Sequence, residues 1–569
     1  MRLNGKLLLV GVCFLMARPL FAQHMFLELN LNSPAMQSMV QSVRPKHTLE
    51  IFRVIERAGN DKRIDGIMLN ITSFHEEQET LWELRNALEK FKSKGKKVCA
   101  FISAANLDLY CLATVADKIV MDDQGALMLL GYAWGRGYAQ HSLEKLGIGV
   151  RELRYMEYKS AAETYTRDSL SDADRIQYGE VLDDIMTITR DTVTKARSWT
   201  AEEFDSILNN EFIFSAKSAL TRGLVDYTGK KEAALEAIKE IAGGKEITHF
   251  LVYGDSDSSL TGSTALYGPG RAGSLFRRPP VIAVIYANGV TDMERGMAAR
   301  TLAHTIREAS EKKRVKALVI RINSPGGSAE AADYIAEAIK DAKTRVPVVV
   351  SMGSIAASGG YWASIHANHI MASPVTLTGS IGVIGSWFYD KGLNTKLGLT
   401  VDSLQRGDHA DLLTGVILPR RDLTSVEETR YREYILDLYG AFTAKVAASR
   451  NMDIEQVESV AQGRVYSGIG ALNAGLIDSL GGLDDAIRIA RDLAKIPDTK
   501  KVAYSEFPKP KFVDKMLEHL LRTNAAVTAG LLLPGTHYVM PLLEDLRYRI
   551  AHNGKVMPIL PIGSGWRAK

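Results

Sequence analysis

The sequence has little cysteine: Cys13, Cys99 and Cys111 are the three cysteines in 569 residues. Cys99 and Cys111 lie in apolar surroundings, so we expect small core residues there rather than a disulfide or a metal pair. No H-E-x-x-H spacing is present, and nothing near the cysteines supplies the other ligands of a zinc site. The sequence therefore predicts chemistry that needs neither a metal nor a cofactor.

Blocks of lysine and arginine with interleaved aromatic residues are also missing. The chain carries 70 basic and 66 acidic residues, a formal net charge of +4. Nucleic-acid-binding proteins concentrate positive charge on one face or stripe. We therefore expect no nucleic-acid partner.

The N-terminal apolar run is too short to be an ordinary membrane span. Arg2 and Lys6 precede Leu7–Ala17, whereas a spanning helix needs about 20 apolar residues. A basic start followed by a short apolar stretch is typical of an export signal. We expect residues 1–22 to be a signal peptide cleaved before Gln23, with an uncleaved membrane anchor as the alternative. Either one directs the protein to the cell envelope.

The chain contains an internal repeat. A length of 569 residues exceeds what one ordinary core supports. Segments of the first half resemble segments of the second half at a shared offset of 251 positions. The matching pairs are Arg63–Leu69 with Arg314–Ile320, Tyr110 with Tyr361, and Leu146-Gly147 with Leu397-Gly398. Ile213–Asp226 also matches Val465–Asp478, at an offset of 252. One offset held over such a span argues against chance similarity of apolar runs.

The repeat suggests a division of the chain into five parts. The stretch Asp255–Pro280 is rich in Gly, Ser and Pro and reads as a linker. The expected parts are 1–22 (signal peptide or N-terminal membrane segment), 23–254 (first repeat), 255–280 (linker), 281–507 (second repeat) and 508–569 (C-terminal tail).

Strand-like and helix-like stretches alternate in the second half. The expected strands are Val281–Tyr286, Ala317–Ile322 and Val348–Met352, and the expected helices are Leu302–Ala309 and Ala329–Ala342. Alternation of this kind builds an α/β domain in which helices cover a largely parallel sheet. We therefore expect two tandem α/β repeats of this class.

Two Gly-rich segments follow neighbouring strands of the expected sheet. Asn323–Ser328 follows one strand, and Ser358-Gly359-Gly360 follows the next. A serine at a strand–helix junction can project from a tight turn, and backbone amides at a helix N-terminus suit a developing oxyanion. In open α/β sheets, ligands gather at the carboxyl ends of the strands. Ser358 is therefore a candidate nucleophile.

Four motifs in order resemble the signal peptide peptidase A family, in its long duplicated form, also called protease IV. They are Tyr158–Ala161, Asn323–Ser328, Ala356–Trp362 and Leu377–Gly382, and the similarity runs from about residue 25 to 500. The resemblance implies a ClpP/crotonase-like fold and a serine endopeptidase on the periplasmic face of the inner membrane. It also implies hydrophobic peptide substrates, signal peptides left in the membrane, and a homotetramer. The N-terminal segment is shorter than the family's anchor.

The resemblance also assigns roles to five residues. It implies Ser358 as nucleophile, Lys159 as general base, Ser380 as the residue that orients the lysine, and the Gly327 and Gly359 amides as the oxyanion hole. A lysine acts as a base only when neutral, so its pKa must fall from about 10.4 towards the operating pH. Burial among apolar groups without a carboxylate partner has that effect.

The duplication gives separate support for this division of roles. At the offset of 251, Ser358 corresponds to Leu107 and Lys159 to Ala410, neither of which can do the chemistry. Gly326, Gly327 and Ser380 correspond to His75, Glu76 and Leu129. Each half therefore keeps one member of the Ser–Lys pair and lacks the other.

Three alternatives compete with this hypothesis. A crotonase-like enzyme would bind an acyl thioester, and an envelope scaffold would have no activity at all. A Ser–His–Asp site would need a histidine against Ser358, and His366 lies too far along the expected helix. The sequence leaves open whether the Ser–Lys pair forms within or between protomers, and what the C-terminal tail does.

Overall fold

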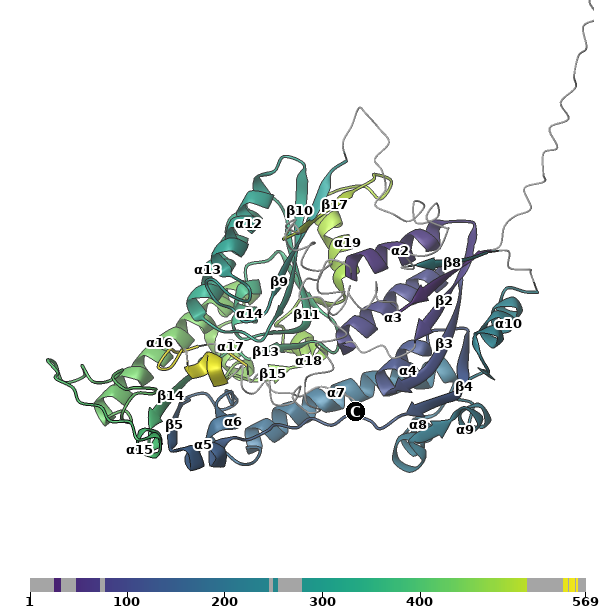
Figure 1. The fold of residues 1–569 in the computed structure, drawn as a ribbon. Coiled ribbons are helices and arrows are strands. Elements are labelled where there is room, and N and C mark those ends of the chain that lie inside the picture. The colour runs from purple at the N-terminus through teal and green to yellow at the C-terminus, as the bar shows by residue number, and fades with distance from the viewer. Residues whose placement is uncertain are drawn as a thin grey trace, which may run out of the picture.

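The computed structural model describes residues 25–31, 48–71, 77–244, 249–253, 279–508, 546–550, 552–557 and 559–560 (Figure 1). Residues 1–22, and with them Cys13 and the expected export signal, lie outside the described residues, as does nearly all of the expected linker. Within the described ranges, no helix is both long enough and apolar enough to cross a bilayer.

The first repeat builds a seven-stranded sheet with the strand order β6-β4-β3-β2-β1-β8, and β7 pairs with β4. All neighbours are parallel except β4 and β6. Its elements are β1 (Met25–Asn30), α2 (Thr48–Asn60), β2 (Ile64–Ile71), α3 (Gln78–Ser93), β3 (Lys97–Asn106), α4 (Leu107–Ala113), β4 (Lys118–Met128), α5 (Gln140–Leu146), β5 (Ile148–Leu153), α6 (Glu163–Thr166), α7 (Asp172–Arg197), α8 (Ala201–Ser206), the π-helical turn η1 (Ile207–Glu211), β6 (Ile213–Ser215), α9 (Ala216–Thr221), β7 (Tyr227–Thr228), α10 (Lys231–Ile241) and β8 (His249–Tyr253).

The second repeat builds an eight-stranded sheet with the corresponding order β15-β13-β11-β10-β9-β17, and β12 lies between β11 and β16. Only the β13–β15 pair is antiparallel. Its elements are β9 (Val281–Asn288), α12 (Ala299–Glu311), β10 (Val315–Ser324), α13 (Ala329–Lys343), β11 (Val348–Ala357), α14 (Gly359–Ser364), β12 (His369–Ala372), β13 (Leu377–Gly379), β14 (Gly385–Asp390), α15 (Leu393–Leu397), α16 (Ser425–Arg450), α17 (Ile454–Val460), β15 (Val465–Tyr466), α18 (Gly468–Asn473), β16 (Ser479–Leu480), α19 (Leu483–Leu493) and β17 (Ala503–Phe507).

The expected α/β fold is confirmed, and equivalent helices and strands of the two repeats are separated by the same sequence offset. β3 and β11 begin and end 251 positions apart, and so do α2 and α12. The five elements expected in the second half are all present, longer than expected by one to five residues. The turn residues that follow a strand remain hydrogen-bonded to the neighbouring strand, so apolar patterning alone underestimates strand length.

The two repeats share a hydrophobic core, with alternate residues of β9 facing different sides. Ile282 and Val284 pack in the same cluster as Phe52 and Leu84 of the first repeat. Ala283 and Ile285 face the cluster that lies under α12 and α13. Successive side chains of a strand point to opposite faces, so one buried strand serves both cores. In Figure 1 the first repeat (purple to blue) lies directly against the second (teal to green).

A two-stranded antiparallel ladder joins the repeats a second time. β5 of the first repeat pairs with β14 of the second, from Leu153 opposite Gly385 to Ile148 opposite Asp390. Lys159 lies six residues after the end of β5, and Ser380 lies five residues before the start of β14. The ladder therefore brings the loop that carries Lys159 to the loop that carries Ser380.

Candidate active site

Ser358 lies between β11 and α14, at the carboxyl end of a central parallel strand. Its backbone has φ 57° and ψ −112°, which is a strained conformation for a residue with a side chain. Hydrogen bonds hold it there: its amide donates to the Gly379 carbonyl at 2.8 Å, and its carbonyl accepts from the Trp362 amide at 2.8 Å. The turn thus places a fully buried hydroxyl at the start of a helix.

Lys159 reaches Ser358 within the same chain. Its Nζ lies 2.6 Å from Ser358 Oγ, 2.9 Å from Ser380 Oγ and 2.9 Å from the Ser380 carbonyl oxygen. A neutral amine has two N–H donors and one lone pair. If both donors go to Ser380, the lone pair is left for the Ser358 hydroxyl. This geometry suits a lysine that removes a proton from the serine.

Burial keeps the amine of Lys159 from carrying charge. Lys159 is 1% exposed, and desolvation places its pKa well below the ordinary lysine value, with the nearby Arg549 guanidinium lowering the pKa further. Among the described residues, no carboxylate forms an ion pair with Lys159. All these influences favour the neutral form that a general base requires.

Gly327 and Gly359 lie together beside Ser358. A side-chain carbon at Gly359 would lie 3.2 Å from the Gly327 nitrogen and 2.6 Å from Thr291 Oγ1. At Gly327, with φ 151°, such a carbon would lie 2.3 Å from the Thr291 carbonyl oxygen, so no other residue fits without movement. The Thr291 amide donates a hydrogen bond to the Gly326 carbonyl, and the Ser328 amide donates one to the Thr291 carbonyl. In a parallel bridge of this kind the Gly327 amide points away from Thr291.

A buried network fixes the loop that carries Lys159. Ser160 Oγ donates to Asp174 Oδ1 at 2.5 Å, and Gln177 Nε2 donates to the Tyr158 carbonyl at 3.2 Å. Gln177 Oε1 accepts from the Val465 amide at 3.0 Å, and Val465 pairs with Gly379, next to Ser380. The α7 side chains therefore fix the lysine loop and the Ser380 loop with respect to each other.

The sequence analysis missed several residues that shape this site. Asp174 and Gln177 gave no signal, because polar residues on a long helix usually face water. Gly463 has φ 83°, and any side chain there would lie 2.6 Å from the Lys159 nitrogen and Cβ. Its place between two polar residues in the Gln462-Gly463-Arg464 turn was the only local hint. Arg549 lies in the C-terminal tail and belongs to no motif that the sequence analysis recognised.

No histidine forms a hydrogen bond with the Ser358 hydroxyl in the part of the chain that the structure describes, where that hydroxyl bonds Lys159 instead. The sequence predicted that His366 lies on the helix that follows Ser358, which is wrong: α14 ends at Ser364, so His366 lies beyond the helix. His366 Nε2 lies 3.7 Å from Glu337, on α13. A short helix followed by a turn carries this imidazole away from the nucleophile.

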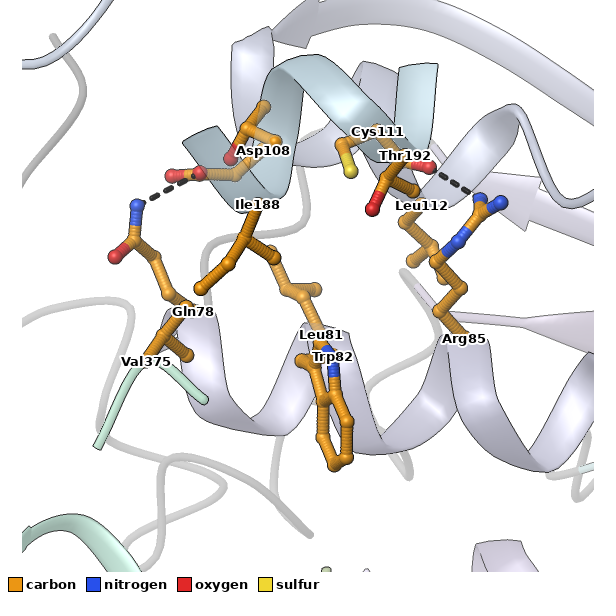
Figure 2. Close-up of a pocket in the computed structure, with 11 residues that line it drawn as sticks. Gln78, Leu81, Trp82, Arg85, Asp108, Cys111, Leu112, Ile188, Thr192 and Val375 are labelled. Atoms are coloured by element: carbon orange, nitrogen blue, oxygen red, sulfur yellow. Dashed lines mark hydrogen bonds between the residues drawn. The ribbon is translucent and has the colours of Figure 1, made fainter. Parts of the chain in front are cut away.

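The equivalent region of the first repeat holds a different set of side chains. Leu107 occupies the position of Ser358 and is 1% exposed, and Leu129 occupies that of Ser380 and is also buried. His75 and Glu76 lie outside the described residues. Figure 2 shows the neighbouring pocket, where Gln78 and Cys111 take part in hydrogen bonds with Asp108 and Arg85 at its two ends. Among its lining residues there is no nucleophile–base pair.

The two described cysteines are free thiols. Cys99 is fully buried, and burial raises its pKa to about 12. Cys111 is partly buried and packs against the core. The expected core role of both residues agrees with this placement.

Comparisons with known proteins agree with the geometry. A family model described as Peptidase family S49 matches residues 90–245 and 340–497. The chloroplastic serine protease SPPA of Arabidopsis thaliana is 31% identical over 462 residues, covering 80% of this chain and 67% of the relative. Protease 4 of Salmonella typhi is 32% identical over 486 residues, covering 83% and 75%.

Among solved structures, ClpP1 from Listeria monocytogenes matches 36% of this chain and 92% of its own, at 18% identity and a TM-score of 0.23.

The relatives from Arabidopsis thaliana and Salmonella typhi are both named proteases, which decides against the acyl-thioester enzyme and the inactive scaffold. The chain is a serine peptidase and belongs to peptidase family S49.

Proposed function

We propose that the chain hydrolyses peptide bonds with Ser358 as nucleophile and Lys159 as general base. The observation that carries the proposal is the distance of 2.6 Å between Lys159 Nζ and Ser358 Oγ, in a buried position where desolvation lowers the pKa of the lysine amine. Ser380 orients that amine through its carbonyl and hydroxyl oxygens. The Gly327 and Gly359 amides serve as the oxyanion hole.

The reaction has two halves. Lys159 accepts the Ser358 proton while Oγ attacks the scissile carbonyl carbon, and the two amides stabilise the negative charge on the carbonyl oxygen. The lysine ammonium then gives its proton to the leaving amine, and an acyl-enzyme forms. In the second half Lys159 takes a proton from water, the resulting hydroxide attacks the ester, and the proton returns to Ser358. No metal or cofactor takes part in this scheme.

For the substrate we propose hydrophobic peptides, and signal peptides left in the membrane in particular. The catalytic atoms are buried among apolar residues, including Ala357, Leu377 and Ile381, which favours apolar chains. One relative, 34% identical over 200 residues, is named a putative signal peptide peptidase SppA, of Enterococcus faecium.

We propose an exported enzyme at the periplasmic face of the inner membrane, in contact with the membrane surface. We also propose that four subunits assemble into a homotetramer, and the molar mass in solution checks this.

Activity of single variants tests the dyad. We expect Ser358→Ala and Lys159→Met each to lower kcat for a fluorogenic apolar peptide at least about 1,000-fold. Ser459→Ala and Lys340→Met remove the same groups from exposed positions and should keep full activity. Hydrolysis at the normal rate in either dyad variant would show that the mechanism is wrong.

A further inference from the structure

A segment close to the C-terminus lies in a slot between two loops of the active site. We call its described residues 553–557 and 559–560 the C-terminal strand. On one side it runs along residues 384–388, which comprise Ile384 and the first four residues of β14, just after Ser380 in the chain. On the other side it meets residues 325–326, which lead into the Gly327 amide. In Figure 1 this yellow segment lies close to β13 and β14.

Backbone hydrogen bonds hold the strand on both sides. Met557 exchanges two antiparallel bonds with Ile384, at 2.8 and 3.0 Å. Leu560 donates its amide to the Pro325 carbonyl at 2.8 Å, and Ile559 forms an antiparallel bridge with Gly326. An extended peptide that binds a protein edge makes bonds of this kind.

The side chains of the strand alternate between two apolar clusters. Met557 and Ile559 pack with Ala161, Ala162 and Ile384, close to Lys159. Leu560 points the other way and is 3% exposed, in a cluster with Ala357, next to the nucleophile, and with Leu377 and Val465. Residues two apart share a face in a strand, so this segment sits as an extended chain whose side chains fill pockets on both sides.

We propose that the C-terminal strand occupies the groove in which the peptide substrate binds, and that an incoming apolar peptide must displace it. The proposal rests on the proposed function in taking this groove as the substrate site. Both partners of the strand are loops that supply catalytic groups, and a substrate aligned between them would pass Ser358. Leu560 then marks the pocket for an apolar, leucine-like side chain of the substrate.

Binding to an inactive enzyme tests this without depending on turnover. The probe is a fluorescein-labelled peptide with the sequence of residues 553–562, NGKVMPILPI, added to full-length Ser358→Ala protein. Adding Leu560→Glu should expel the tethered strand and tighten probe binding about tenfold or more, because the groove is then open in most molecules. Lys555→Glu, at an exposed position of the same strand, should leave the affinity unchanged. Equal affinity in the Leu560→Glu protein would overturn the proposal.

Hydrogen exchange gives a second readout that needs no change in the strand. In the Ser358→Ala protein, saturating unlabelled peptide should speed exchange of the Met557 and Leu560 amides, since both lose their partners. Amides that stay protected while the probe is bound would overturn the proposal as well. Activity remaining in Ser358→Ala would instead contradict the dyad, so the two failures are distinguishable.

Discussion

At the residue scale, two serines in strained conformations flank one buried lysine. Ser358 has φ 57° and Ser380 has φ 51°, and each such residue costs about 1–3 kcal/mol. The Ser380 amide donates to the Arg464 carbonyl at 2.7 Å, as the Ser358 amide does to Gly379. The strain is therefore held by backbone bonds from neighbouring segments, and it keeps both hydroxyls on the amine.

Arg549 provides a test of how the lysine is kept neutral. Its buried positive charge disfavours an ammonium on Lys159 and lowers the lysine pKa. Arg549→Gln should raise that pKa, so the rising limb of kcat/KM against pH should move to higher pH and activity at neutral pH should fall. Arg547→Gln removes the same charge from an exposed position and should not move the limb. Identical profiles for the two variants would contradict the role of Arg549.

The sequence supports these residues unequally. Ser358 lies in a Gly-rich turn after a buried strand, and that local pattern was enough to nominate it, whereas the roles of Gly327 and Gly359 came from the family resemblance. Lys159 has no local sign of burial, since most lysines are exposed. Its environment comes from α7, the Ser380 loop and Arg549, which are distant in sequence, so only the family resemblance pointed to it.

At the element scale, the β5–β14 ladder aligns the two catalytic loops. Each strand comes from a different repeat, and neither sheet contains them. The equivalent of β5 in the second repeat, residues 399–404, is not a strand. The repeats therefore differ at this element, and for this reason the shared offset did not predict the ladder.

Gly149 offers a way to disturb this ladder alone. Any side chain there would lie 2.2 Å from the Tyr389 ring. Gly149→Val should shift β5 and the lysine loop, and a displacement of about 1 Å at the reacting atoms lowers kcat about 100-fold. Gly137→Val, at a glycine with open space around it, is the matched control. We expect both to keep the wild-type circular dichroism spectrum, and full activity of Gly149→Val would contradict the role of the ladder.

At the scale of the whole molecule, a buried ion cluster joins the repeats far from the dyad. Arg321 of β10 binds Glu79 and Glu83 of α3, with Nη1 2.8 Å from Glu83 Oε1, and also Ser351 Oγ at 2.7 Å. Burial lowers the pKa of Arg321 to about 9 and also raises the pKa of Glu83 well above its ordinary value, and the guanidinium is still charged at neutral pH. Because its carboxylate partners belong to the other repeat, the cluster couples the folding of the two halves.

Removing this arginine should destabilise the protein markedly. Arg321→Met would leave two carboxylates buried without their cation, a loss of about 3–5 kcal/mol in the free energy of unfolding. Denaturant unfolding measures it. Adding Glu79→Gln and Glu83→Gln should recover much of the loss, because no buried charge then lacks a partner. An unchanged midpoint in Arg321→Met would contradict this account.

The repeat organisation was the most predictable feature at this scale, and the C-terminal segment the least. The alternation of strand-like and helix-like stretches predicted the fold class, and the shared offset of 251 positions extended that prediction to both halves. The C-terminal strand lies beyond β17, the last strand of the second repeat, and has few described residues. The strand is held by backbone hydrogen bonds to residues 325–326 and 384. These residues are distant in sequence, so the pairing could not be predicted before the fold was known.

The most direct test of the central claim is the pH dependence of kcat/KM for wild type and for Lys159→Met. A neutral base is needed, so wild-type activity should rise as pH passes the lowered pKa of Lys159 and level off well below the ordinary lysine value of 10.5. Lys159→Met should lose both the activity and the rising limb. A limb centred near 10.5, or one that persists in Lys159→Met, would contradict a neutral lysine as the base for Ser358.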